Sequence, residues 1–486
     1  MPQPLHFQTA TELVGRLRAG ELSASELLEH QIARIEALDG QLNAVVARDF
    51  ERAREKARAA DAELAAGGSD KPLLGLPVTL KDVFETEGLV TTCGAPELAA
   101  HVPTRNADVV QRFADAGAIV IGKTNVPLWA GDCQSFNEVY GTTNNPWDVA
   151  RSPGGSSGGA AASLAAGFTP LEIGSDIGGS IRNPSHFCGV FGHKPTWGVI
   201  SDRGHIPGPP GQLGETDLNA VGPMARSAAD LALGLDVLVG PRDLGASGER
   251  GGWRLDLPAA RASSPAGLRV AAWLDDAFSP VDGDCRGVLE ATADRLEREG
   301  AKVDRTARPE FDFTHAYETY LMMLLPVIAA GFPKELIDGM QSAAAGLGDD
   351  RSMPALQIRG SVLSHRDWIH HDEARQQIAA AWRRFFLDFD LLLLPVHPRA
   401  AFPHDQRPSF HDRTLTVNGR EEPYLDFLKW VSLPTLVGLP STVAPVGRTP
   451  EGLPVGVQIV GARFEDRSTV EAASWLGEFT PPPDFV

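Results

Sequence analysis

The sequence predicts an α/β protein in which helices cover both faces of a β-sheet. Short, continuously apolar runs, such as 76–80 and 389–395, are typical of strands that are buried on both faces. Helical patterns separate these runs, and the order helix then strand occurs at 107–123 and again at 284–304. Strands that alternate with helices in this way form a sheet sandwiched between helices.

The N-terminal part is expected to be helical. In 23–38, Ser23 and Glu26 have the spacing of a capping box. The apolar residues that follow fall on one stripe, as in an amphipathic helix, and they are Leu27, Leu28, Ile32, Ile35 and Leu38. A charged, alanine-rich helix is expected at about 50–66, because Gly67 and Gly68 end the pattern.

Further strands are expected wherever apolar residues run on without interruption. The candidates after 76–80 are the end of 107–123 and the segments 268–274, 389–395 and 455–460. Two stretches rich in proline and glycine, 204–214 and 239–267, are expected to be loops. Strand-like segments lie on both sides of each loop and no repeat divides the chain, so we expect a single domain over 1–486.

The charge of the chain excludes some classes of partner. Its 486 residues include 63 acidic and 44 basic side chains, which gives a formal net charge of −19. Binding to nucleic acid or to an anionic membrane surface needs clustered Lys and Arg, so neither partner is expected. The longest apolar run, 321–332, contains Pro326 and is shorter than the roughly 20 residues that span a bilayer. No transmembrane helix is predicted.

Neither a secreted protein nor a metal or cofactor site is expected. The N-terminus lacks the basic start and apolar core of a signal peptide. The four cysteines lie far apart and form no CxxC pair, which favours reduced thiols in the cytoplasm; they are Cys93, Cys133, Cys188 and Cys285. His365, His370 and His371 lie on a charged, helix-like segment without a second ligand cluster, so we expect them to face solvent.

The most informative stretch of the sequence is 152–195. This stretch contains two clusters of glycine and serine, at 154–159 and 174–180. Glycine lets the backbone approach another group closely, and successive N–H groups in such a turn form an anion-binding nest. A nest of this kind suits an oxyanion hole, and a serine at its edge suits a nucleophile.

Other interpretations of these clusters compete with that one. A phosphate-binding loop would need a GxxxxGK[ST] pattern, which does not follow either cluster. Residues 154–158 satisfy GxSxG, but a nucleophile elbow needs a strand directly before it, and the residues before 154 are loop-like. Clusters of this composition are most often flexible loops, and for either cluster alone that interpretation would stand.

Several long motifs follow one another in a fixed order. The stretch 154–195 begins with GGSSGG and continues with GSDIGGSIR-x-P-x-x-FCG, and GLPVTLKD stands upstream at 75–82. GKTN and GTTNNPWD lie between these two, and VGPMARSAAD and GLPVGVQIVG follow downstream. Together the motifs resemble the amidase signature family, over about 23–465. Ala160, His186 and His193 depart from the residues usual in that family, and the effect of His186 on the site is left open.

The resemblance implies both a fold and a site. The implied fold is the amidase signature fold, a large mixed β-sheet sandwiched between α-helices. Its parts would be an N-terminal helical part at about 1–70, a signature core at about 75–200 and a variable, substrate-lining region at about 201–430. The resemblance makes Ser180 the nucleophile, Ser156 the bridging serine and Lys81 the base. Backbone N–H groups would form the oxyanion hole, and they belong to Ile177, Gly178, Gly179 and Ser180.

Chemical reasoning supports this choice of base. A serine hydroxyl is a weak nucleophile, and a lysine activates it only when burial or nearby cations keep the amine neutral. Lys81 follows an apolar strand, so its burial is expected. Lys123 and Lys194 are rival bases, to which we assign structural roles because the resemblance places the base at Lys81.

Several neighbours of the predicted triad are expected to be structural. Ser157 and Ser185 are expected to support their loops, and Cys188, within an apolar run, is expected to be a packed thiol. Asp176 and Arg182 flank the nucleophile and are expected to pair across its turn.

The implied reaction is hydrolysis of a carboxamide through an acyl-enzyme, and an ester or a carbamate also presents a carbonyl to Ser180. Aryl acylamidases, fatty-acid amide hydrolases, peptide amidases and nylon-oligomer hydrolases share the family, and the sequence does not choose among them. The aromatic and aliphatic residues of 317–332 favour a fairly apolar small-molecule substrate, and we expect the loop 204–214 to border the entrance.

Two other functions stay open. One is the A subunit of a glutamine-dependent tRNA amidotransferase, which shares the triad and needs partner subunits. The other is a non-catalytic binding protein on the same scaffold, although Lys81, Ser156 and Ser180 are all intact. Whether the chain forms a homodimer is also left open.

Overall fold

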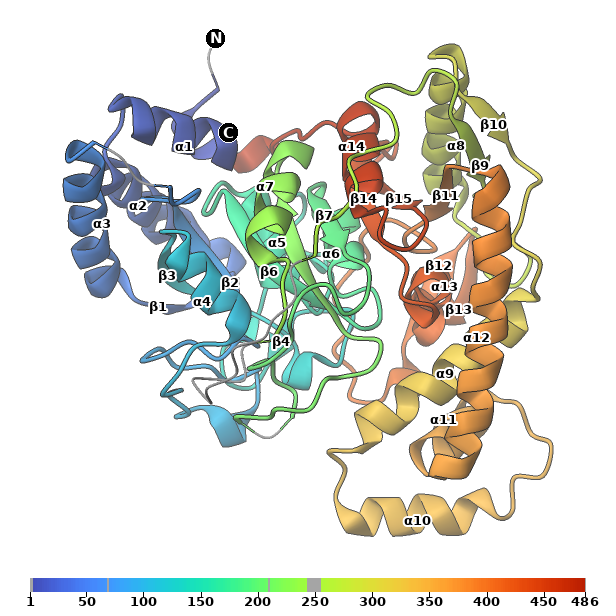
Figure 1. The fold of residues 1–486 in the computed structure, drawn as a ribbon. Helices are drawn as coiled ribbons and strands as arrows, with labels where there is room; N and C mark the ends of the chain where they lie inside the picture. The colour runs from blue at the N-terminus through green and yellow to red at the C-terminus, as the bar shows by residue number, and fades with distance from the viewer. Residues whose placement is uncertain (1–2, 68–69, 209, 243–254, 486) are drawn as a thin grey trace.

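The computed structural model describes residues 3–67, 70–208, 210–242 and 255–485. Three parts of the sequence predictions lie outside the described residues: Gly68 at a helix end, Pro209 in the first predicted loop and 243–254 in the second. The described chain forms the predicted α/β architecture, with mixed sheets between layers of helices (Figure 1).

Two sheets form the centre of the molecule. The smaller has the strand order β1 (Val45–Arg48), β3 (Ile119–Thr124) and β2 (Pro77–Lys81). The larger has eight strands, in the order β10 (Lys302–Asp304), β9 (Arg269–Ala272), β11 (Leu391–Pro395), β15 (Pro454–Val460), β14 (Ser441–Arg448), β7 (Phe191–Lys194), β8 (Ala220–Ala225) and β6 (Leu171–Asp176). Strands β9, β10 and β11 pair in parallel and the other neighbours are antiparallel, so the sheet is mixed.

Side chains join the two sheets where β2 runs beside the edge strand β6. Thr79 Oγ1 donates a hydrogen bond of 2.5 Å to Glu172 Oε1, and Lys81 at the end of β2 reaches Ser175 of β6. Every residue of both strands is buried. This junction therefore places the lysine of the predicted triad in the interior of the protein.

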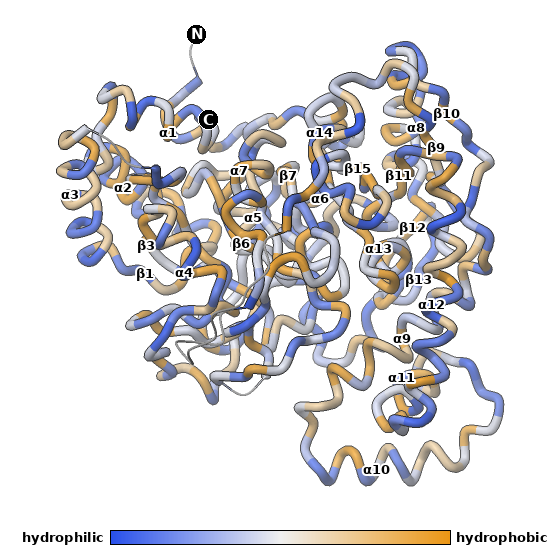
Figure 2. The backbone as a smooth tube through the Cα atoms, in the orientation of Figure 1, coloured by the Kyte–Doolittle hydropathy of each residue, from blue (hydrophilic) through white to orange (hydrophobic). Residues whose placement is uncertain are grey.

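Fourteen helices surround the sheets in the described part of the chain. They are α1 (Ala10–Ala19), α2 (Ala24–Leu42), α3 (Phe50–Ala65), α4 (Asp108–Asp115), α5 (Gly158–Ala165), α6 (Arg182–Cys188), α7 (Ala228–Leu238), α8 (Gly283–Arg298), α9 (Phe313–Ala329), α10 (Lys334–Ala344), α11 (Met353–Ser361), α12 (His365–Asp388), α13 (Leu428–Leu436) and α14 (Asp466–Leu476). Two short hairpins complete the fold, β4 (Phe136–Asn137) with β5 (Gly141–Thr142) and β12 (Thr414–Val417) with β13 (Arg420–Pro423). Figure 2 shows hydrophobic residues gathered along the central strands, whereas the outer helices α3 and α12 carry many hydrophilic ones.

The alternation of side chains along β7 shows that α6 and α14 cover opposite faces of the large sheet. His193 lies 3.3 Å from Asp466 at the start of α14. The preceding residue, Gly192, faces α6, and a Cβ there would lie 2.2 Å from Ser185 Oγ. Because successive residues of a strand point to opposite faces, the helix with the nucleophile loop and α14 are separated by the sheet.

Most elements predicted from the sequence are confirmed, with shifts of a few residues at their ends. Helix α2 has the predicted capping box, with Ser23 and Glu26 each bonded to the other's backbone. Strands β2, β9, β11 and β15 lie where continuous apolar runs predicted them. Strands β6 and β8 were not predicted, because Gly, Ser and Pro interrupt their apolar residues. No helix within the described ranges is long and apolar enough to cross a membrane.

Candidate active site

Three segments that are distant in the sequence meet at the junction of the two sheets. They are the end of β2 with Lys81, the turn 153–157 before α5, and the loop 177–181 between β6 and α6. Lys81 Nζ lies 2.7 Å from Ser156 Oγ and 3.0 Å from Ser175 Oγ. Ser175 received no role from the sequence, although it lies within a motif, because nothing in the pattern shows that its hydroxyl faces Lys81.

The turn with Ser156 and the loop with Ser180 are joined directly. The backbone N–H of Ser157 donates a hydrogen bond of 3.1 Å to the carbonyl oxygen of Ser180. Lys81 and Ser156 are fully buried, whereas Ser180 is partly exposed. The peptide bond between Gly155 and Ser156 is cis. The predicted nucleophile is thus open to a substrate, whereas the predicted relay and base are shielded from water.

Burial sets the protonation of Lys81. Transfer of the amine from water into the interior lowers the pKa of Lys81 to about 7, although negative charge at Asp176 and Glu172 opposes that shift. Burial also raises the pKa of Glu172 to about 7. A lysine with a pKa near neutrality can hold a lone pair for a neighbouring hydroxyl, which an ordinary surface lysine cannot do.

A buried ion pair braces the loop with Ser180. Asp176 accepts hydrogen bonds from the N–H groups of Gly179 (2.8 Å) and Ile181 (3.1 Å), and Arg182 Nη2 donates to the same carboxylate at 2.7 Å. Burial by itself would raise the pKa of Asp176, but the charge and hydrogen bonds of Arg182 outweigh it and lower the pKa to about 2. The structure thus has the pair between Asp176 and Arg182 that the sequence predicted.

Arg182 also ties this loop to elements far along the chain. Its guanidinium donates to the backbone oxygen of Val431 at 2.9 Å, to Thr435 Oγ1 at 2.6 Å and to Gln458 Oε1 at 2.5 Å. We expect Arg182→Met to destabilise the fold by about 3–5 kcal/mol, because it leaves the Asp176 carboxylate buried and unpaired. Urea unfolding would measure this. Arg182→Met combined with Asp176→Asn should recover part of the loss, and a single variant as stable as the wild type would contradict the prediction.

The loop 177–180 is closely packed at both of its glycines. Gly179 has a φ of +91°, and a Cβ on it would lie 2.6 Å from Asn183 Nδ2. A Cβ on Gly178 would lie 3.1 Å from Tyr320 Oη. The Gly179 N–H already has an acceptor in Asp176, so we expect the other three N–H groups, of Ile177, Gly178 and Ser180, to bind the oxyanion. The oxyanion hole stays a prediction.

Tyr320, on α9, supports this loop from outside the signature region. Its hydroxyl donates a hydrogen bond of 3.2 Å to the carbonyl oxygen of Ile177. We expect Tyr320→Phe to lower kcat about five-fold with little change in KM, because loss of a hydrogen bond worth ~1 kcal/mol loosens the loop. Tyr317→Phe is the matched control, since the Tyr317 hydroxyl is buried without a hydrogen-bond partner among the described residues. Equal effects of both changes would contradict this role for Tyr320.

The chain matches the Amidase family over residues 26–470. The protein belongs to the amidase signature family. It is therefore an amide hydrolase or an amidotransferase.

Relatives of this amidase signature protein cover almost its whole length. The A subunit of the glutamyl-tRNA(Gln) amidotransferase of Psychrobacter cryohalolentis is 32% identical to it over 98% of this chain and 97% of its own. The solved structure of 6-aminohexanoate cyclic dimer hydrolase with its substrate has a TM-score of 0.76 at 27% identity, over 99% of this chain and 100% of that one. A third relative is a chain from a vestigial protein complex, whose structure reveals the evolutionary origins of an s-triazine catabolic enzyme. Its TM-score is 0.78 at 28% identity, over 96% of this chain and 97% of that one. The predicted amidase signature fold is confirmed.

The two rival lysines of this amidase signature protein are engaged elsewhere. Lys123 donates to the backbone oxygen of Phe84 and, at 3.0 Å, to Thr86 Oγ1, which holds the chain that follows Lys81. Lys194 donates to the backbone oxygen of Leu439 at 2.6 Å. Both side chains are buried, and burial lowers the pKa of Lys123 to about 8 and that of Lys194 to about 7. A lowered pKa alone does not identify a base, and only Lys81 contacts Ser156.

His193 lies between Thr442 Oγ1, at 2.8 Å from Nδ1, and Asp466 Oδ1, at 3.3 Å from Nε2, on the face of the large sheet opposite α6. His186 is on the α6 side of that sheet. His186 Nδ1 accepts from the Gly456 N–H at 2.8 Å and Nε2 donates to the Arg399 oxygen at 3.1 Å, so both ring nitrogens have backbone partners. Burial lowers the pKa of His186 to about 4, which keeps the ring neutral. His365 and His370 are exposed, as predicted, whereas His371 is half-buried. Within the described residues, no group of three potential metal ligands lies together.

The start of the loop 204–214 lies against the segment that follows Lys81. The Glu85 N–H donates to the Gly204 oxygen and the Ile206 N–H donates to the Val83 oxygen, both at 2.8 Å. Burial lowers the pKa of His205 to about 3, and the charge of Lys81 contributes to this shift. The base of the loop is thus close to Lys81, and its role at the entrance stays a prediction.

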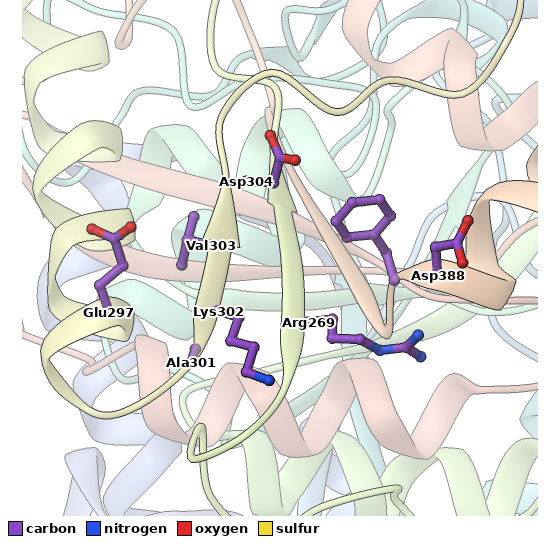
Figure 3. A pocket seen from close by; sticks show the side chains of 8 residues that line it. Arg269, Glu297, Ala301, Lys302, Val303, Asp304 and Asp388 are labelled. Carbon is purple, nitrogen blue, oxygen red and sulfur yellow. The ribbon is translucent and has the colours of Figure 1, made fainter.

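A hollow of about 560 Å³ lies elsewhere, beside β9 and β10 (Figure 3). Its charged side chains are of both signs and do not converge, and Arg269 is paired with Asp390 at 2.8 Å. Strand β10 is at one edge of the large sheet, and β6, which leads to the nucleophile loop, is at the other. We therefore do not assign this hollow to the reaction.

Proposed function

We propose that the protein is an amidase that hydrolyses carboxamides through an acyl-enzyme on Ser180, with Ser156 as proton relay and Lys81 as base. The observation that carries this proposal is the distance of 2.7 Å between Lys81 Nζ and Ser156 Oγ, both buried. Because burial lowers the pKa of Lys81 to about 7, the neutral amine is available near neutral pH.

Acylation begins when Ser180 Oγ attacks the carbonyl carbon. Its proton passes to Ser156 Oγ while the Ser156 proton passes to Lys81 Nζ, and the carbonyl oxygen becomes an oxyanion. The backbone N–H groups of Ile177, Gly178 and Ser180 hold that oxyanion. The carbon–nitrogen bond then breaks, Ser156 gives its proton to the leaving nitrogen, and Lys81 returns a proton to Ser156.

Deacylation repeats these steps with water in place of the nucleophile. Water attacks the ester carbonyl of the acyl-enzyme and gives a proton to the relay, and the bond to Ser180 Oγ breaks with return of that proton. The products are an amine and a carboxylic acid. An ester or a carbamate presents the same carbonyl, so we include both as side activities.

The substrate that we propose is a fairly apolar small-molecule amide. Tyr320 and Leu428 lie against Gly178, and Val431 lies against Gly179, so the side chains beside the nucleophile loop are aromatic or aliphatic. Such walls favour an apolar acyl or amine group. We also propose the cytoplasm as the compartment, since all four cysteines are unpaired and buried.

A second candidate is the A subunit of a tRNA amidotransferase. The relative from Psychrobacter cryohalolentis carries that name, and so does one from Chloroflexus aggregans at 34% identity over 95% of this chain. The region 431–447 lacks the NLAG pattern that we associate with those subunits. Co-purification of the natively expressed chain with partner subunits would favour this candidate.

Hydrolysis of p-nitroanilides with short and long acyl groups tests the proposal directly. We expect a burst of p-nitroaniline equal to the enzyme concentration on the best substrate, as an acyl-enzyme accumulates. Mass spectrometry of the quenched enzyme should place the acyl group on Ser180. Glutaminase activity that appears only with added partner subunits would instead establish the amidotransferase.

A further inference from the structure

A pocket of about 420 Å³ lies between α12 and the C-terminal end of α13, outside the residues that carry the proposed reaction. Helix α12 runs down the right of Figure 1 beside α13. The volume is within the usual range of small-molecule sites, about 300–1,000 Å³. Thr435 forms part of its wall, and the same threonine accepts a hydrogen bond from Arg182. The pocket is thus adjacent to the residues that brace the nucleophile loop.

The side chains that line this pocket carry a net positive charge, whereas the whole chain is negatively charged. Its lining includes four arginines and one aspartate, although the net charge of the whole chain is −19. Asp217 is paired with Arg375 at 2.8 Å, and Arg261 is paired with Glu465 at 2.8 Å. Among the described residues, the remaining two arginines, Arg383 and Arg463, have no acidic partner. Two unneutralised guanidinium groups at one pocket attract an anion.

The body of the pocket is apolar. Its walls contain large aromatic and aliphatic side chains, which are Trp197, Leu218, Trp382, Phe386, Leu436 and Leu439. Trp382 is 1% exposed, and its Nε1–H has no acceptor in the described part of the chain. The ring of Trp382 therefore forms a fixed part of the apolar wall.

From the two free guanidinium groups and the aromatic and aliphatic walls, we infer that this pocket binds an organic carboxylate with an aromatic or aliphatic body. The carboxylate lies toward Arg383 and Arg463, and the body packs against Trp197 and Phe386. A neutral ligand of the same shape would keep the apolar contacts and lose the charged hydrogen bonds. The inference does not depend on the proposed reaction.

The test is binding of 1-naphthoate to the full-length Ser180→Ala protein. Calorimetry and the quenching of tryptophan fluorescence measure the affinity. We expect 1-naphthoate to bind at least tenfold more tightly than 1-naphthalenemethanol, its neutral match, because charged hydrogen bonds contribute about 1.5–3 kcal/mol. Arg383→Gln and Arg463→Gln should each weaken binding of the acid about tenfold. None of the changes should alter binding of the alcohol by more than about two-fold.

Arg384→Gln is the matched control, since Arg384 is the next residue of α12, is exposed and does not line the pocket. It should leave binding of both ligands unchanged. Equal affinities for the acid and the alcohol would overturn the inference. So would acid binding that survives in both Arg383→Gln and Arg463→Gln, because the anion would then lie elsewhere. Circular dichroism of each variant separates loss of the site from loss of the fold.

Discussion

Ser180→Ala is expected to lower kcat/KM for a p-nitroanilide about 10⁶-fold, the loss typical of removing a serine nucleophile. Without Ser180 Oγ no acyl-enzyme forms, and the rest of the site can only bind and polarise the substrate. The relay would lose the group from which it takes a proton. The burst of p-nitroaniline should disappear together with steady-state turnover, and stopped-flow absorbance would show both.

Ser185→Ala is the matched control for this change. Ser185 is a buried serine close in sequence to the nucleophile, and its Oγ donates to the oxygen of Ile181, the residue before α6, at 2.8 Å. We expect it to keep most of the wild-type activity, since it does not touch Lys81 or Ser156. Activity that survives in Ser180→Ala would refute the triad, whatever the control shows.

Lys81→Met is expected to lower kcat/KM about 10²–10⁴-fold, the usual contribution of a general base. Methionine fills most of the buried volume of the lysine but accepts no proton, so Ser156 would keep its own. Because the wild-type amine is buried with its pKa lowered, the change should cost little stability. The measurement is kcat/KM on the same anilide, with the thermal midpoint of each protein recorded beside it.

The pH dependence of kcat/KM distinguishes a base from a structural lysine. Lys81 accepts a proton only when neutral, and the pKa of Lys81 is lowered to about 7. Activity should therefore rise with pH through about 7 and then level, with a fall of about tenfold per pH unit on the acidic side. The control variant Lys302→Met, on the edge strand β10, should keep this fall of kcat/KM at acidic pH. Lys81→Met should lose it. An unchanged acidic limb in Lys81→Met would assign the titration to another group.

The sequence was sufficient to predict those strands and helices whose buried residues are all apolar. Strands β2 and β11 are unbroken apolar runs, and α2 shows its cap and its apolar stripe in the order of its residues. Strands β6 and β8 were missed for a physical reason. A Cβ on Gly174 or Gly222 would lie within 3 Å of neighbouring atoms, so close packing selects small residues there that do not look like a strand.

The sequence by itself determined the family and the α/β fold and was enough to predict the triad, because long motifs in a fixed order carry that information locally. Only the tertiary structure decided which groups act on those residues. Ser175 beside Lys81, Tyr320 under the nucleophile loop, and the bonds of Arg182 to Thr435 and Gln458 all join segments that are distant in the chain. Such contacts form when strands and helices pack, and the burial that lowers the pKa of Lys81 arises in the same step. A sequence pattern records which side chains are present, and packing decides which of them meet.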